Sequence, residues 1–91
     1  MNKVDTNILA QEINMLWPAV RKRSKLPDDN TVDFLKCSEG CYLSVYSPRI
    51  QNCIYTDDID LGRENLAQAL EGLGYVIVRG TPNTRCVVGK K

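Results

Sequence analysis

The sequence predicts a single small α+β domain, 1–91, in which two helices cover one face of an antiparallel sheet. The chain has 91 residues, which is enough for one hydrophobic core and too few for two. Apolar residues recur with the helical period in two segments and alternate with the period of a strand in several others. Short turns rich in Pro, Gly, Asp and Asn join these segments in the order α-β-β-β-α-β-β. Such short connections favour neighbouring antiparallel strands.

The first helix is expected to start at Asp5 or Thr6, because either side chain can accept a hydrogen bond from an amide at a helix N-terminus. Its apolar residues share one stripe, which consists of Leu9, Ile13, Leu16, Trp17 and Val20. Pro18 has no amide hydrogen, so we expect the helix to kink near Trp17 or to restart at Pro18. The helix should end before Pro27. Its last turn then contains a basic cluster, Arg21, Lys22, Arg23 and Lys25, where cations suit the helix dipole.

A change to period two after residue 30 predicts a meander of three strands. Residues 31–36 and 41–46 are expected to form a hairpin through the turn 37–40, and 50–55 to add the third strand. Within 41–46, three apolar residues alternate with Tyr42, Ser44 and Tyr46. If Cys41, Leu43 and Val45 point into the core, both tyrosines lie on the opposite face of the sheet.

The second helix is predicted after 57–60, where three aspartates offer capping groups and suit the positive end of the helix dipole. Its expected apolar stripe consists of Leu66, Ala69, Leu70 and Leu73. Gly74 is suited to the left-handed conformation that often ends a helix. Residues 75–79 form the strongest strand candidate, and a turn at 80–83 leads to a last short strand, 85–88. We expect 89–91 to be a polar tail.

The charge of the chain is small in total and uneven along its length. Residues 1–27 carry five basic and two acidic groups (+3), 28–74 carry three and nine (−6), and 75–91 carry four and none (+4). These values sum to the net charge of +1. Such a chain can present a cationic surface to phosphate or to an acidic protein. The alternative is a well-mixed folded surface that needs no partner.

The residue types argue against most enzymes and metal sites. The chain has no histidine, which removes the commonest general base and the commonest metal ligand. Of the cysteines Cys37, Cys41, Cys53 and Cys86, only the first two have the close spacing of a zinc pair. We therefore expect reduced, mostly buried cysteines, with zinc or disulfides as the alternatives. We expect no cofactor, because no glycine-rich phosphate loop is present.

No apolar run is long enough to span a bilayer, and the N-terminus lacks the unbroken apolar stretch of a secretory signal. We expect a soluble, cytoplasmic protein with no membrane partner.

With most enzymes, metal sites, cofactors and membrane spans disfavoured, we expect a non-enzymatic binding protein. The expected partner-binding residues combine the basic cluster with the tyrosine row and the turn that follows it, namely Arg21, Lys22, Arg23, Lys25, Tyr42, Tyr46 and Arg49. Exposed tyrosines and arginines are enriched at interface hot spots, and aromatics on a sheet can stack on unpaired bases. The alternative for each group is structural: the tyrosines pack the sheet, and the cations serve the helix end.

In general character, a short chain with segregated charge and no catalytic or cofactor motif resembles the small stand-alone proteins by which phages and mobile elements block host machinery, anti-CRISPR proteins among them. This resemblance implies inhibition by occupying a surface of a larger protein or ribonucleoprotein complex, with direct contacts to phosphate among the options. One alternative is a stand-alone module that binds single-stranded nucleic acid. A thiol-dependent enzyme is a second alternative, disfavoured because no histidine can activate a cysteine. The oligomeric state stays open.

Overall fold

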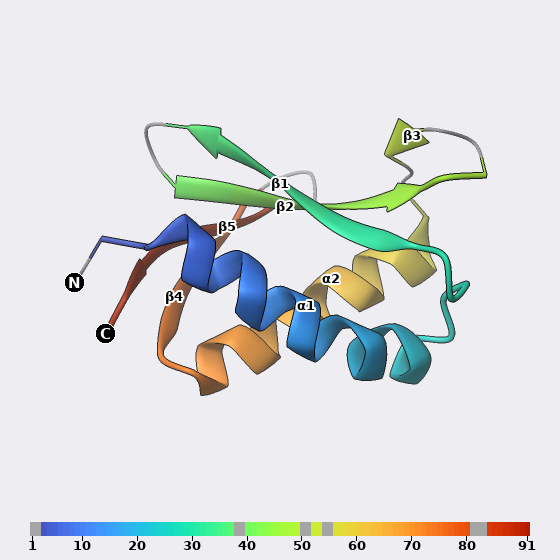
Figure 1. Ribbon diagram of the computed structural model, residues 1–91, viewed down its shortest axis with the longest axis horizontal. Coiled ribbons are helices and arrows are strands. Elements are labelled where there is room, and N and C mark those ends of the chain that lie inside the picture. The colour runs from blue at the N-terminus through green and yellow to red at the C-terminus, as the bar shows by residue number, and fades with distance from the viewer. Residues whose placement is uncertain (1–2, 38–39, 50–51, 54–55, 81–83) are drawn as a thin grey trace.

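The computed structural model describes residues 3–37, 40–49, 52–53, 56–80 and 84–91. Its helices are α1 (Thr6–Arg23) and α2 (Asp57–Gly72), and its strands are β1 (Thr31–Cys37), β2 (Gly40–Ser47), β3 (Asn52–Cys53), β4 (Tyr75–Arg79) and β5 (Arg85–Lys90). Both helices lie against the same face of the sheet, in a layer below it in Figure 1. The predicted α+β class, with an antiparallel sheet and two helices on one face, is confirmed.

The sheet has the strand order β1-β2-β5-β4, and every pair is antiparallel. The β1–β2 hairpin has a continuous register from Thr31 opposite Tyr46 to Cys37 opposite Gly40. The first part of β2 pairs with β5, and its last two residues pair with β3. The C-terminal strand thus lies between β2 and β4, so β1 and β4 stand at the two ends of this strand order.

Helix α1 begins as its sequence predicts. The carboxylate of Asp5 accepts hydrogen bonds from the amides of Asn7 and Ile8, at 3.0 and 3.2 Å. The predicted stripe faces the core, with Leu9, Ile13, Trp17 and Val20 buried and Leu16 packed against them. Pro18 lies inside one continuous helix, so the expected restart at this residue is wrong. Both Pro18 and Asn14, whose carbonyl loses its usual amide partner, are exposed, so water can bond that carbonyl.

The core lies between the sheet and the two helices. Its buried residues include Leu43 and Val45 of β2, Ile59, Leu66 and Leu70 of α2, and Val87 of β5. The helices approach closely at Gly62, where an added Cβ would lie 2.7 Å from Cδ1 of Leu26 and 3.6 Å from the Trp17 ring. A larger residue at this position would require the Leu26 side chain to shift.

Two expectations near α2 need correction. Thr56, not an aspartate, is the N-cap, and its hydroxyl oxygen accepts a hydrogen bond from the amide of Ile59 at 3.2 Å. The three aspartates occupy the first turn, where their charge still suits the dipole. Leu73 is exposed rather than part of the apolar stripe, because the helix ends at Gly72 and Leu73 is its C-cap. Gly74, with a φ of +97°, has the left-handed conformation expected of it.

The strand predictions hold best where the described residues are continuous. β4 has the expected bounds, and β2 is one residue longer at each end than expected. Residues 89–91 are not a free tail: β5 continues to Lys90, and the amide of Lys91 donates to the carbonyl of Gly74 at 2.8 Å. Of the expected third strand, 52–53 pair with β2, and 50–51 and 54–55 lie outside the described residues, as do the turn residues 38–39 and 81–83.

Candidate functional site

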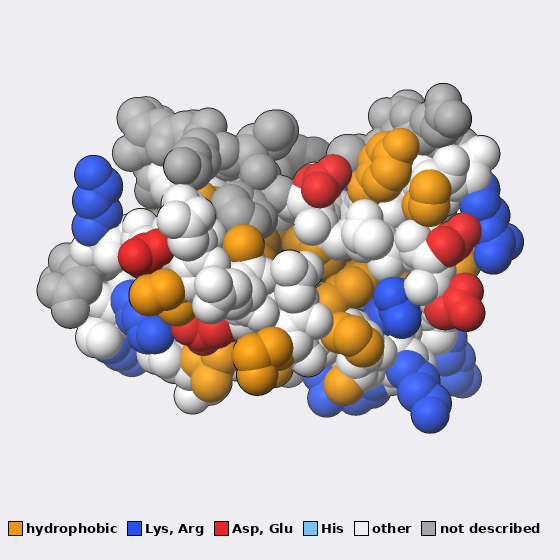
Figure 2. Space-filling model, in the orientation of Figure 1, with side chains coloured by type: hydrophobic (Ala, Val, Ile, Leu, Met, Phe, Trp, Pro, Cys, Tyr) orange, Lys and Arg blue, Asp and Glu red, His pale blue; other side chains and the backbone are white. Residues whose placement is uncertain are grey.

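The basic cluster lies at the C-terminal end of α1. Lys22, Arg23 and Lys25 are exposed, whereas Arg21 is half-buried and its Nη1 donates to the backbone carbonyl of Asn30 at 3.4 Å. Figure 2 shows the basic side chains gathered at the right-hand end of the molecule and below it, where α1 ends. The structure thus makes three of the four residues available to a partner and gives Arg21 a structural contact.

The chain turns sharply directly after this helix. Ser24 caps α1: its amide and its hydroxyl both donate to the carbonyl of Val20, at 2.9 and 2.8 Å. Lys25 follows with a φ of 60°, a left-handed conformation that is unfavourable for any residue with a Cβ. It is the one non-glycine residue with positive φ in the described part of the chain. A lysine therefore occupies a position at which glycine would be less strained.

Arg49 pairs with the turn that follows the basic cluster. Nε of Arg49 lies 2.6 Å from Oδ2 of Asp29, which joins the end of β2 to the turn before β1. The Arg49 side chain is 68% exposed, so this ion pair is well solvated and contributes little to stability. The carbonyl of Asn30, in the same turn, accepts a hydrogen bond from Nε1 of the buried Trp17 at 2.7 Å. These contacts fix the turn against α1, and with it the position of the cations.

The described cations differ in whether they have a carboxylate partner. Among the described residues, Arg49, Arg79, Arg85 and Lys90 form ion pairs with carboxylates. No described carboxylate forms an ion pair with Lys22, Arg23 or Lys25. These three residues are defined here as the free basic end of the molecule.

The two tyrosines lie on the other side of the sheet. Cys41, Leu43 and Val45 are buried on the face that the helices cover, so Tyr42 and Tyr46 face the opposite way, as the alternation predicts. Tyr42 is 36% exposed and Tyr46 is half-buried. The structure therefore ties Arg49 to the turn after the basic cluster, and it places the tyrosines on the open face of the sheet, separated from α1 by the sheet itself.

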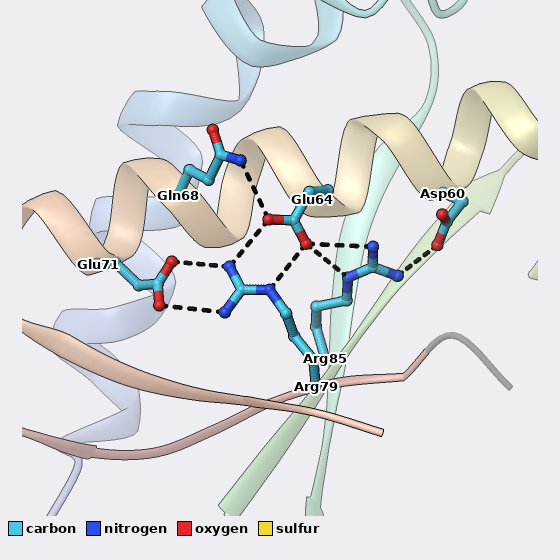
Figure 3. A network of polar contacts seen from close by, with 6 residues as sticks. All are labelled: Asp60, Glu64, Gln68, Glu71, Arg79 and Arg85. Carbon is cyan, nitrogen blue, oxygen red and sulfur yellow. Dashed lines mark hydrogen bonds and ion pairs between the residues drawn. The ribbon is translucent and has the colours of Figure 1, made fainter. Parts of the chain in front are cut away.

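A polar network that the sequence analysis missed connects α2 to β4 and β5 (Figure 3). Arg79 donates to both carboxylate oxygens of Glu64, at 2.8 and 2.9 Å, and to both oxygens of Glu71, at 3.1 and 2.7 Å. Arg85, which is buried, bonds Glu64 and Asp60. The spacing of the three acids, i, i+4 and i+11, places them on one side of a helix and was the available signal. Their arginine partners come from distant strands.

The network shifts the pKa values of Glu64, Glu71 and Arg79. Hydrogen bonds from Arg79 hold the pKa of Glu64 at about 2, well below its ordinary value of 4.5, although burial acts in the opposite direction. The same arginine lowers the pKa of Glu71. Hydrogen bonds from Glu71 and Glu64 raise the pKa of Arg79. These groups are charged at neutral pH and bond one another, so the network acts as a structural link between α2 and the two strands.

The described cysteines and acids form no cluster suited to a metal. Cys41 and Cys86 are buried, as expected, and the side chains of Cys37 and Cys53 lie outside the described residues. In the ranges that the structure describes, no three Cys, Asp or Glu side chains converge in a way that could hold an ion. No helix of these ranges is both long and apolar enough to cross a bilayer.

Comparison with protein-family models, with curated proteins and with solved structures finds no match for this chain. Its candidate site therefore has to be judged on its own geometry.

Proposed function

We propose that this protein is a non-enzymatic binding protein that places its free basic end against an anionic surface of a larger protein or nucleoprotein. The observation that carries the proposal is that Lys22, Arg23 and Lys25 are exposed and lack a carboxylate partner among the described residues. Cations in this state are available to phosphate or to acidic side chains without breaking an internal ion pair.

The backbone of Lys25 supports the same proposal. A left-handed residue at a helix end is usually glycine, and strain retained at a side chain of a particular chemistry is a reason to suspect function. The contacts of Trp17 and Arg21 with the carbonyl of Asn30 hold the end of the helix in place, so the cations are presented on a rigid support.

Tyr42 offers a second contact surface on the open face of the sheet. An exposed tyrosine can anchor a protein partner or stack on an unpaired base. A partner that touches both surfaces has to reach from the end of α1 to the open face of the sheet. Binding of this kind acts by occupying a surface, in the manner of a stoichiometric inhibitor, and involves no turnover.

Affinity capture with matched charge variants tests this proposal. Lys22→Glu with Arg23→Glu reverses two charges at the free basic end, and Lys3→Glu with Lys91→Glu makes the same change of net charge at the chain ends. Figure 1 shows those ends at the opposite side of the molecule. Each tagged variant would be incubated with a lysate of the source cells, with and without nuclease, after circular dichroism has shown that it is folded.

We expect the parent chain and the Lys3/Lys91 variant to retain the same partner, and the Lys22/Arg23 variant to lose it. Loss of the partner after nuclease treatment would assign the contact to nucleic acid, and retention would assign it to protein. Equal capture by both double variants would refute a role for the free basic end.

A further inference from the structure

The outer edge of β4 is the least protected edge of the sheet. Among the described residues no strand pairs with its outer side, so its backbone amides and carbonyls there are available to another strand. Its central residues are Val76, Ile77 and Val78, without a charge among them. β1, the opposite edge, carries the exposed Asp33 within the strand, and a charge of this kind discourages edge pairing.

The geometry of β4 is regular, which favours pairing. The sheet has a β-bulge between β4 and β5, where Val76 lies opposite Gly89 and Ile77 lies opposite Val87. The extra residue, Val88, therefore belongs to β5, the inner strand. Val78 of β4 is 52% exposed on the open face of the sheet, an unusual position for an apolar residue in a strand.

The charge at the end of β4 is neutralised. Arg79 turns toward α2, where Glu64 and Glu71 hold its guanidinium by four hydrogen bonds (Figure 3). A second strand that approached β4 would therefore meet no unpaired cation from Arg79.

We propose that two copies of this chain pair antiparallel through β4 and form a two-fold dimer with one continuous sheet. The strand is self-complementary about Ile77: antiparallel pairing places Val76 opposite Val78 of the second copy, and Tyr75 opposite Arg79. No like charges face each other in this register. The pairing is closed, because it uses the same edge of both copies and leaves the charged β1 edges outermost.

The dimer also extends an apolar row. Tyr42, Cys86 and Val78 lie opposite one another on β2, β5 and β4, and Val76 of the second copy would continue this row across the new strand pair. In Figure 1, β4 lies toward the end of the molecule that holds the two termini, and α1 ends at the opposite side. Pairing through β4 would therefore leave both free basic ends accessible, and this inference stands independently of their proposed role.

Light scattering after gel filtration, over a range of protein concentrations, tests the dimer. We expect the mass to rise from 10.2 kDa toward twice that value as the concentration increases. Val78→Lys places a charge at the centre of the shared edge and should remain monomeric at every concentration. Ser44→Lys, on the same face of the sheet but on an inner strand, should dimerise like the parent chain.

A monomeric parent chain at all concentrations would overturn the proposal. So would loss of the dimer in both variants, because that result indicates stacking of two open sheet faces. Amide hydrogen exchange of the parent chain provides a test that needs no variant. The amides of 76–78 should exchange more slowly at high protein concentration, and rates that do not change with concentration in a dimeric sample would place the interface elsewhere.

Discussion

Lys25 links the stability of the chain to its proposed binding. Its φ of 60° costs about 1 to 2 kcal/mol for a residue with a Cβ, and glycine avoids most of this cost. We expect Lys25→Gly to raise the free energy of unfolding by about 0.5 to 1 kcal/mol in urea titration, and to weaken binding of the partner. Lys25→Ala, which removes the charge and keeps the strain, should weaken binding equally without raising stability. A Lys25→Gly variant that binds like the parent would show that neither the charge nor the strained backbone of Lys25 contributes to binding.

Leu70 and Leu73 provide a second test at the scale of single residues. Leu70 is fully buried, and we expect Leu70→Ala to lower the free energy of unfolding by about 2 to 4 kcal/mol because it opens a cavity. Leu73 is 45% exposed, so Leu73→Ala should cost less than about 1 kcal/mol. Urea denaturation of both variants measures the difference. Equal losses would mean that the helix ends later than Gly72.

The burial of Leu70 and the exposure of Leu73 show what helical periodicity can and cannot predict. The spacing of Leu66, Ala69, Leu70 and Leu73 fits one helical stripe, and it correctly places the buried leucines. It fails at Leu73 because the period applies only while the helix continues, and the left-handed Gly74 ends it. The contacts of Arg79 and Arg85 were beyond prediction for a different reason. They depend on which strands lie beside α2, and strand order is not encoded in local spacing.

At the scale of elements, Thr56 fixes the start of α2. Its hydroxyl satisfies the amide of Ile59, so we expect Thr56→Ala to lower the free energy of unfolding by about 0.5 to 2 kcal/mol. Thr56→Ser keeps the hydroxyl and should be nearly neutral. Thermal or urea unfolding of the pair measures the effect of the cap alone. If the serine and alanine variants lose equal stability, one of the following aspartates caps the helix, as the sequence had suggested.

The network between α2 and the strands should make stability sensitive to acid. The pKa of Glu64 is lowered from 4.5 to about 2 by hydrogen bonds from Arg79, so its contribution is fully present above about 4.5. That contribution should be lost as the pH falls from about 4.5 through about 2, where the folded state also takes up the proton. Urea titrations across this range should show a steeper decline for the parent chain than for Glu64→Gln. Parallel declines would indicate that the carboxylate of Glu64 is not held by Arg79 in solution.

Strand limits were predictable where the sequence contains its own boundary signals. β4 lies between Gly74 and Gly80, and its three central β-branched residues match a strand, so its bounds were predicted correctly. β5 was predicted to be too short because Gly89 and Lys90 have low strand propensity. Pairing with Val76 and Tyr75 keeps both residues in the ladder. Tertiary pairing thus overrides local preference at the end of the chain.

At the scale of the whole molecule, the charged segments of the sequence have two different roles: some charges form internal ion pairs, and others stay exposed without such partners. The acidic middle segment supplies Asp60, Glu64 and Glu71, which are used internally by Arg79 and Arg85 of the basic C-terminal segment. The basic N-terminal segment keeps its exposed cations without such partners. Sequence alone could identify the basic cluster and the tyrosine row, because both are local patterns. Whether they share a surface depended on the packing of α1, which places it on the face of the sheet away from Tyr42.

This separation gives distinct kinetic signatures for the two surfaces. Lys22 and Arg23 lie at one end of the molecule, where exposed charge steers approach, so Lys22→Glu with Arg23→Glu should mainly slow association with the isolated partner. The effect should shrink as salt is raised, because exposed charges are screened beyond about 10 Å at 0.1 M salt.

Tyr42→Ala removes an apolar anchor worth about 1 to 3 kcal/mol, and this loss should appear as faster dissociation at any salt concentration. Surface plasmon resonance at low and high salt separates these outcomes. If the charge reversal accelerates dissociation and leaves association unchanged, the cations contact the partner at close range and do not act by steering. If Tyr42→Ala changes neither rate constant, the partner does not reach the open face of the sheet.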